Sequence, residues 1–271
     1  MSSTQIELRQ ICWSDETLAS LPVGFIPIDH RHNDRPDWRE LWPIRNFVRS
    51  HSLRDGVMYG FLSPKFSYKT GLSYEQVEAF ISANRHDEDL AFFSPFWDLS
   101  SFALNVFEQG DMFHPGLMET AQLFANEVGL DVDLTQAVTH SGNSIFCNYV
   151  VGTRRFWEKW LDLADRLVAC ADGNAGSASL RALLNQDTRY GEQRLPRKIF
   201  VMERLPTLLL LTDPELTASA YDCFRLPPSN TPLNRFFKEA VSCDALKRAH
   251  VTSGSPAYLH TYRTLRNSII H

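Results

Sequence analysis

The first half of the chain alternates short apolar runs with amphipathic segments. The runs have the length of buried strands, and the amphipathic segments repeat apolar residues at three- and four-residue steps, as helices do. The predicted strands are 6–13, 23–28, 57–62, 89–94 and 145–151. Among the amphipathic segments, those at 102–107, 117–128 and 156–168 are predicted to be helices. Strands mixed with helices in this way indicate an α/β fold.

A further helix is predicted to begin at Pro36. Trp38, Trp42 and Arg45 recur at three- and four-residue steps, so they share one face of this helix. Pro43 lies inside the same segment and lacks the N–H that an interior helical position donates. The expected element is therefore a helix that is kinked or interrupted by an irregular turn.

Helical patterns dominate the chain beyond residue 180. They cover 199–211, 215–223, 233–249 and 258–270. No internal repeat or low-complexity tract is visible in the sequence. We therefore predict an α/β domain over residues 1–212 and a helical C-terminal extension over 213–271.

The composition is that of a folded globular protein. Of the 271 residues, 44% are hydrophobic and 22% are charged, which is sufficient for a core without disulfide or metal crosslinks. The formal net charge of −5 opposes binding to phosphate backbones, so a protein whose main task is to grip nucleic acid is excluded. Aromatic residues reach 12%, which fits either a thick core or a stacking site.

Five cysteines are spread widely along the chain. None belongs to a Cys-x-x-Cys pair or to a Cys/His cluster with zinc-site spacing, so we expect free thiols in a reducing compartment. The N-terminal residues lack the basic and apolar segments of a signal peptide. The longest apolar run, around 208–211, is far shorter than the ~20 residues that span a bilayer. The expected location is cytoplasmic.

The common nucleotide-binding, hydrolase and metalloprotease motifs are absent. The sequence contains no GxGxxG, P-loop, HExxH or GxSxG motif, so the enzyme classes that depend on them lose their usual support. Open α/β sheets bind ligands beyond the carboxyl ends of their strands. Polar residues that follow predicted strands are therefore the first candidates for a site.

Two polar segments meet this condition. The run 29–35 (DHRHNDR) begins with Asp29 and follows the second predicted strand. The segment 63–71 follows the third predicted strand, and its Ser63, Lys65 and Lys69 carry groups suited to holding an anion. Ordinary solvated loops are the alternative for both segments.

Three other clusters hold candidate acid–base or hydrogen-bonding groups. Glu108 and His114 lie within one short segment, and general-base catalysis uses such groups beside a reactive hydroxyl. A structural histidine is the alternative for His114. Asn148 interrupts an apolar strand, where an amide must be hydrogen-bonded to be buried. Glu203 and Arg204 have apolar flanks, which indicates either a structural ion pair or a carboxylate aimed at a site.

Four segments, taken in their order along the chain, carry a family resemblance. They are 35–47 (RPDWRELWPIRNF), 59–66 (YGFLSPKF), 147–151 (CNYVV) with the following Phe156 and Trp157, and 200–205 (FVMERL). This series resembles a group of bacterial proteins that look like distant relatives of GT-A-type bacterial polysaccharide glycosyltransferases. The resemblance covers residues 35–205 and leaves 213–271 outside.

The resemblance implies a GT-A-like fold, a Rossmann-like α/β/α sandwich that binds a nucleotide sugar beyond the strand ends. Typical members carry an Asp-x-Asp that holds a divalent cation against the diphosphate, whereas the corresponding place here reads Ser63-Pro64-Lys65. Without those carboxylates a hard cation lacks its oxygen ligands. We therefore hypothesise transfer without a metal, in which lysines neutralise the leaving diphosphate, and assign no metal-binding residue. A reaction that uses a divalent cation is the alternative.

The resemblance also suggests roles for individual residues. The predicted nucleotide-sugar-binding residues are Asp29, Asp37, Arg45, Ser63, Lys65, Lys69, Asn148 and Arg204. Within this set Lys65 and Lys69 would contact the diphosphate, and Asp29, Asp37 and Arg45 the nucleoside or sugar. The catalytic base would be Glu108, His114 or Glu203.

The function implied is transfer of a sugar from a nucleotide sugar to a saccharide or lipid-linked acceptor in surface polysaccharide synthesis. A binding or assembly protein that kept the fold and the pocket without turnover is one alternative. The other is a hydrolase that uses the carboxylates Asp98, Glu108 and Asp111.

The expected partners are a nucleotide sugar and a glycan acceptor, with no nucleic acid. The C-terminal helices carry the basic residues Lys247, Arg248, Arg263 and Arg266 near aromatic and aliphatic side chains. Such a helix suits peripheral contact with the inner face of the inner membrane. An ordinary packed helix with a solvated basic face is the alternative.

Overall fold

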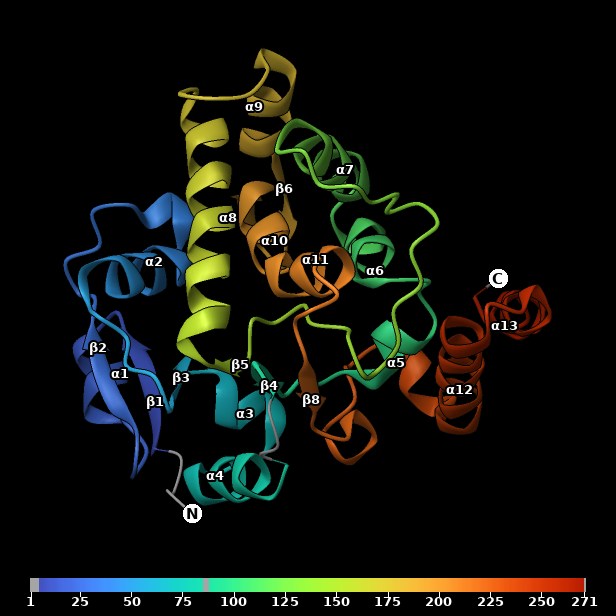
Figure 1. Ribbon diagram of the computed structural model, residues 1–271, viewed down its shortest axis with the longest axis horizontal. Coiled ribbons are helices and arrows are strands. Elements are labelled where there is room, and N and C mark those ends of the chain that lie inside the picture. The colour runs from blue at the N-terminus through green and yellow to red at the C-terminus, as the bar shows by residue number, and fades with distance from the viewer. Residues whose placement is uncertain (1–4, 85–87, 271) are drawn as a thin grey trace.

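The structure of the chain is a computed structural model that describes residues 5–84 and 88–270 (Figure 1). Its centre is a six-stranded sheet in the order β2-β1-β3-β5-β4-β8. The strands are β1 (Gln5–Cys12), β2 (Ile26–Asp29), β3 (Val57–Leu62), β4 (Leu90–Phe92), β5 (Val150–Gly152) and β8 (Ala218–Ala220). β5 is antiparallel to its neighbours β3 and β4, and the other pairs are parallel. The predicted α/β fold is confirmed.

Helices surround this sheet. Those before β5 are α1 (Asp15–Ala19), α2 (Leu41–Ser50), α3 (Phe66–Thr70), α4 (Tyr74–Ala83), α5 (Trp97–Ser101), α6 (Val106–Phe113) and α7 (Leu117–Glu127). Those after β5 are α8 (Arg154–Asp172), α9 (Ala178–Asn185), α10 (Lys198–Met202), α11 (Leu205–Thr212), α12 (Phe237–Ser253) and α13 (Pro256–Asn267). The remaining elements are a hairpin, β6 (Asp187–Tyr190) with β7 (Gln193–Pro196), and the 3₁₀ turns η1 (Pro36–Trp38), η2 (Cys223–Arg225) and η3 (Pro232–Arg235).

Helices cover both faces of the sheet, which explains why β3 is apolar at every position. Tyr59 and Phe61 belong to the core cluster that includes α2 and α8, whereas Met58 and Leu62 belong to the cluster that includes α4. In Figure 1, α2 and α8 lie on one side of the sheet and α4 on the other. A strand with both faces buried reads as a continuous apolar run rather than an alternating one.

The order of the strands creates a switch point between β1 and β3. The chain passes from β1 to β2 on one side and then returns to form β3 on the other side of β1. Loops that leave neighbouring parallel strands in opposite directions open a crevice at the carboxyl ends of those strands. The crevice is expected just beyond Cys12 and Leu62, the last residues of β1 and β3.

The helix predicted to begin at Pro36 is interrupted. η1 ends at Trp38. The next residue, Arg39, has a φ of 50° in the left-handed region, and α2 begins only at Leu41. Pro43 does not kink α2, because it lies in the first turn, where a backbone N–H has no partner within the helix. The interruption turns Arg39 and Glu40 out of the helix and towards the crevice.

Two predicted elements are shorter than their apolar patterns. Of the predicted strand 145–151, only the last residues pair in β5, because Asn148 has a φ of 54° and the Ile145 N–H donates to Thr207 instead (2.7 Å). The predicted helix 199–211 is divided into α10 and α11 at Glu203 and Arg204, and Pro206 lies in the first turn of α11.

Two predicted helices are wrong. Residues 102–105 are not helical, because the Asn105 side chain accepts hydrogen bonds from the Phe107 and Glu108 N–H groups (both 2.9 Å) and starts α6 at Val106. The predicted helix 215–223 is replaced by β8, which pairs with the edge of β4. The β6–β7 hairpin was not predicted, and its turn contains Gly191 with a φ of 59°.

The C-terminal helices pack beside α5 at one end of the molecule (Figure 1). β8 lies within the segment predicted as the extension and yet completes the central sheet, and the division at residue 212 stays a prediction. No helix in the described ranges is long and apolar enough to cross a bilayer. All five cysteines are free thiols.

Candidate ligand-binding pocket

A cavity of about 360 Å³ occupies the switch point of the sheet. Ile11 and Trp13 line it from the end of β1, and Ser63 lines it from the end of β3. Asn148 and Tyr149 reach the same edge, because β5 is antiparallel and begins where its neighbours end. The topology alone therefore brings together residues from three separate parts of the chain.

The outer wall of the pocket comes from segments that the strand pattern does not reveal. The η1–α2 connection contributes Arg39 and Glu40, and α10 contributes Phe200 followed by Glu203. The hairpin contributes Tyr190, which is 41% exposed. Trp13 (39% exposed), Tyr190 and Phe200 make this wall partly aromatic, a surface suited to stacking against a sugar or a base.

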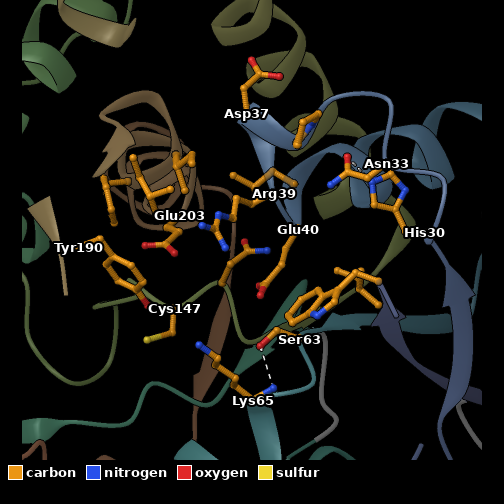
Figure 2. Close-up of a pocket in the computed structure, with 18 of the residues that line it drawn as sticks. His30, Asn33, Asp37, Arg39, Glu40, Ser63, Lys65, Cys147, Tyr190 and Glu203 are labelled. Carbon is orange, nitrogen blue, oxygen red and sulfur yellow. Dashed lines mark hydrogen bonds between the residues drawn. The ribbon is translucent and has the colours of Figure 1, made fainter. Parts of the chain in front are cut away.

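Two carboxyl groups, those of Glu40 and Glu203, point into the same space (Figure 2). Burial raises the pKa of Glu40 to about 7, and the nearby Glu203 adds to this effect, while Lys69, Lys65 and Arg39 oppose it. Burial also raises the pKa of Glu203, against the influence of Arg204 and Lys69. Carboxyl groups with raised pKa in a cleft are typical of acid–base sites.

Three cationic side chains of the pocket have no carboxylate partner among the described residues: those of Arg39, Lys65 and Lys69. Arg39 donates only to the Gln193 side chain (2.6 Å), and Lys69 lies over the rings of Phe96 and Tyr149, 5.8 Å and 5.9 Å from their centres. The neighbouring Cys147 and Glu203 raise the pKa of Lys69 despite its burial. These cations are available to an anionic ligand.

Backbone strain and an unsatisfied polar atom also gather here. Within residues 5–84 and 88–270, the non-glycine residues with positive φ are Arg39, Phe96 and Asn148. Arg39 and Asn148 line the pocket, and Phe96 stacks with Lys69 of its wall. Asn148 is 6% exposed, and its side-chain oxygen has no hydrogen-bond partner among the residues that the structure describes. Strained residues persist where function requires their geometry, and a buried polar atom without a partner calls for a ligand or water.

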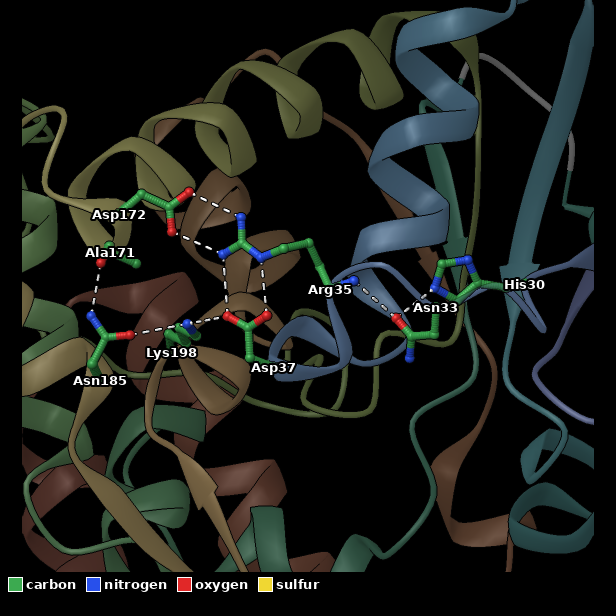
Figure 3. Close-up of polar contacts among 8 residues, drawn as sticks. All are labelled: His30, Asn33, Arg35, Asp37, Ala171, Asp172, Asn185 and Lys198. Carbon is green, nitrogen blue, oxygen red and sulfur yellow. Dashed lines mark hydrogen bonds and ion pairs between the residues drawn. The ribbon is translucent and has the colours of Figure 1, made fainter.

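Asp37 reaches the pocket wall but is already engaged (Figure 3). Its carboxylate accepts hydrogen bonds from Arg35 (3.0 and 3.2 Å) and from the buried Lys198 (2.6 Å). Arg35 also bridges to Asp172 at the end of α8 (2.9 Å). This network joins η1 to α8 and α10, so Asp37 holds the wall in place and points away from the centre of the pocket (Figure 2).

The structure brings six predicted site residues into the pocket: Asp37, Ser63, Lys65, Lys69, Asn148 and Glu203. Ser63 lies behind Lys65, accepts a hydrogen bond from the Lys65 N–H (3.3 Å) and contacts the Tyr149 hydroxyl (3.3 Å). Three other predicted ligand contacts lie outside it. Asp29 pairs with Arg31 (2.6 Å), and Arg45 pairs with Asp165 of α8 (2.5 Å).

The third, Arg204, is buried behind the pocket. Its guanidinium donates to the backbone oxygens of Val106 and Phe200 (both 2.8 Å) and to the Gln109 side chain (2.9 Å). Its distance to the Glu203 carboxylate is 3.7 Å, longer than any of these hydrogen bonds. Arg204 therefore ties α6 to α10, and each of its three nitrogens already donates to a protein acceptor.

Two predicted bases also lie outside the pocket. Glu108 accepts hydrogen bonds from the Leu104 N–H and from Arg266 of α13 (2.7 Å). His114 stacks on Phe200, with the ring centres 3.6 Å apart, and its Nδ1 contacts the backbone oxygen of Arg189 (3.1 Å). Burial and Arg204 lower the pKa of His114 to about 4. Glu203 is thus the predicted base that the fold places beside the unpaired lysines.

The carboxylates of the hydrolase alternative are not brought together. Asp98 is fully buried and accepts hydrogen bonds from Ser229 (N–H, 2.8 Å) and Thr231 (3.1 Å). Asp111 accepts from the N–H groups of Gly116 (2.9 Å) and Met118 (3.1 Å) at the start of α7. Among the described residues, no group of three or more His, Cys, Asp and Glu side chains is arranged to hold a metal ion.

Sequence reasoning missed several residues that line the pocket, above all Trp13, Arg39, Glu40 and Tyr190. Trp13 is the last residue of a predicted strand, and a position at the carboxyl end of a strand was a usable signal. Arg39 and Glu40 were hidden because their segment was expected to be helical, and Tyr190 because its hairpin was not expected.

Comparison of the chain with protein-family models, with curated proteins and with solved structures found no match in any of the three.

Proposed function

We propose that the chain transfers a sugar from a nucleotide-sugar donor to a saccharide or lipid-linked acceptor, as its resemblance to polysaccharide glycosyltransferases implies. The observation that carries the proposal is a single cavity at the switch point that holds unpaired cations beside two carboxyl groups. The cations suit the negative charge of a nucleoside diphosphate, and a carboxyl group can accept the proton of a reacting hydroxyl. The mixed sheet with helices on both faces is compatible with a GT-A-like sandwich.

In this proposal the diphosphate lies against Lys65, Lys69 and Arg39. These cations stabilise the charge that develops on the leaving diphosphate, which is the main electrostatic demand of the transition state. Trp13 and Tyr190 offer exposed ring faces for the nucleobase or the sugar.

Glu203 is the proposed base. An oxygen of the acceptor hydroxyl forms a bond to the anomeric carbon as the bond from that carbon to the diphosphate breaks. The hydroxyl proton passes to the Glu203 carboxylate, and the nucleoside diphosphate leaves with the electron pair. Glu203 lies at the break between α10 and α11, and its orientation is therefore fixed by two helices.

Titration with nucleoside diphosphates, with and without a chelator, tests the proposal. UDP, GDP, CDP or TDP should bind with a Kd of about 1 mM or lower, and Lys65→Ala and Lys69→Ala should each weaken the binding by about tenfold or more, since each removes a charge-assisted contact. Lys238→Ala is the matched control, because Lys238 is exposed on α12 and remote from the pocket. Loss of binding in the presence of chelator would show that a divalent cation takes part.

Binding by itself does not separate a transferase from a binding protein that lacks turnover. The separating measurement is release of the nucleoside diphosphate from a nucleotide sugar in the presence of glycan acceptors, in the wild type and in Glu203→Gln. We expect release that Glu203→Gln reduces by at least about a hundredfold. If no nucleoside diphosphate binds under either condition, the glycosyltransferase proposal is wrong.

A further inference from the structure

We propose that Glu40 is a second acid–base residue of this pocket, and that Glu40 holds the proton that it shares with Glu203 in the ligand-free protein. The proposal assigns a role to a residue that the sequence did not single out as a site residue. Its consequence for nucleotide binding rests on the proposed function, whereas the shared proton itself does not.

The placement of Glu40 is the first argument. Glu40 precedes α2 at the N-cap position, and its side chain does not cap the free N–H groups of the first turn. It forms no hydrogen bond and no ion pair with any described residue. The carboxyl group instead points into the cavity, towards the space that Glu203 also faces (Figure 2).

The charges that face Glu40 come from every wall of the pocket. Lys65 and Lys69 face it from the start and the end of α3, Arg39 from its own connection, and Glu203 from the α10–α11 break. Cys147, Tyr149 and Tyr190 line the same cavity as neutral groups, since burial raises the pKa of each above its usual value. Burial and the nearby Glu203 carboxylate both raise the pKa of Glu40, so Glu40 holds a proton more firmly than an isolated glutamate does.

The neighbours decide which carboxyl group is protonated. Glu203 lies 3.7 Å from the guanidinium of Arg204, a fixed and buried cation, whereas no cation in the described part of the chain lies within ion-pair distance of Glu40. The negative charge is therefore more stable on Glu203 and the proton more stable on Glu40. Burial, together with Glu203, raises the pKa of Glu40 to about 7, which agrees with this assignment. Protonated Glu40 can donate a hydrogen bond to a ligand oxygen, while Glu203 stays available as the base.

This arrangement makes binding of an anion depend on pH. A diphosphate that enters between Lys65 and Arg39 adds negative charge beside Glu40 and further favours the protonated form. Binding therefore takes up protons, and the affinity falls as the pH rises above neutrality, by up to about tenfold per pH unit for a single proton.

The test compares UDP binding by calorimetry at several pH values between about 6 and 8.5 in wild type, Glu40→Gln and the control Glu119→Gln. Gln is close in shape to protonated Glu, so Glu40→Gln should keep the affinity measured at low pH and lose the decline at high pH. Glu119 is exposed on α7 and does not line the pocket, so its variant should follow the wild type. A decline that is the same in Glu40→Gln and wild type would overturn the proposal, and the ionisation of UDP itself cancels in the comparison.

A second measurement needs no ligand and separates this proposal from the proposed function. Carboxyl carbon NMR of Glu-labelled protein should show a group that titrates near neutral pH in wild type and is absent in Glu40→Gln. In Glu203→Gln the same group should titrate at least about half a pH unit lower, because the repelling charge has gone. If the group titrates near 4, as an ordinary glutamate does, the shared proton is refuted even when nucleotides bind. If it titrates near 7 and no nucleotide binds, the shared proton stands and the proposed function fails.

Discussion

Asp37 shows how a residue chosen as a ligand contact can serve the structure instead. Burial opposes its ionisation, but hydrogen bonds from Arg35 and Lys198 outweigh that effect and lower the pKa of Asp37 to about 2. An unfolded Asp has a pKa of about 3.9, so the stability that Asp37 contributes is present above pH ~4 and is lost as the pH falls through 2. Lys198 is only 4% exposed, and Asp37 is the carboxylate that neutralises it.

Asp37→Asn should therefore destabilise the protein at neutral pH. The Asp37 side chain is 39% exposed, so we expect a loss of about 1–2 kcal/mol, less than for a fully buried ion pair. The free energy of unfolding, measured with urea, gives the loss. In a Lys198→Met background, where the buried charge is absent, Asp37→Asn should lower the free energy of unfolding by distinctly less. Equal losses in both backgrounds would show that Lys198 does not depend on Asp37.

At the scale of elements, the break between α10 and α11 sends two adjacent side chains in opposite directions. Glu203 faces the pocket, while Arg204 enters the core and donates to acceptors on α6 and α10. Gly110 of α6 makes room for this guanidinium, since a Cβ at that position would lie 2.8 Å from it. The positions of the Glu203 carboxyl group in the pocket and of the Arg204 guanidinium behind it thus depend on the packing of two helices far apart in sequence.

Arg204→Met should leave buried acceptors on Val106, Phe200 and Gln109 without donors and destabilise the protein by about 3 kcal/mol or more. Arg204→Lys should rescue only part of this loss, because one ammonium group cannot reproduce the planar fork. Thermal and urea unfolding of the two variants measure the difference. Full rescue by lysine would mean that Arg204 acts through its charge alone.

At the scale of the molecule, buried polar contacts attach the C-terminal helices to the rest. Lys247 of α12 is fully buried and donates to the backbone oxygens of Ser100 (2.9 Å) and Ala103 (2.8 Å) at the end of α5. Arg266 of α13 pairs with Glu108 of α6 (2.7 Å). The sequence suggested Glu108 as a catalytic base and Lys247 and Arg266 as membrane contacts. In the structure, all three side chains form these contacts between the C-terminal helices and the rest of the molecule.

Lys247 should make the stability of the molecule depend on pH. Burial lowers its pKa to about 8 in the folded state, against about 10.4 when unfolded. Between these values the unfolded chain binds more protons, so the contribution of Lys247 to stability rises with pH across this window, by up to about 3 kcal/mol. The measurement is the difference in urea stability between wild type and Lys247→Met at pH values across the window. A difference that does not change with pH would contradict the prediction.

The sequence by itself determined the α/β class, the position of β3 and the segment after it that carries Lys65 and Lys69. These features are local, because an apolar run of strand length and the polar residues that follow it depend on neighbours in the chain. It also singled out Asn148 and Glu203 as polar groups in apolar surroundings, and both line the pocket.

Only the tertiary structure decided which of these candidates meet. The switch point arises because β3 returns to the other side of β1, and β8 forms because β4 offers an unpaired edge. Arg39 and Glu40 line the pocket because the residue that follows η1, Arg39, has a positive φ. Glu108 and Arg45 lie outside the pocket, because they form ion pairs with Arg266 of α13 and Asp165 of α8. Glu40 and Glu203 line the same pocket because of contacts between residues distant in sequence, and no local pattern records such contacts.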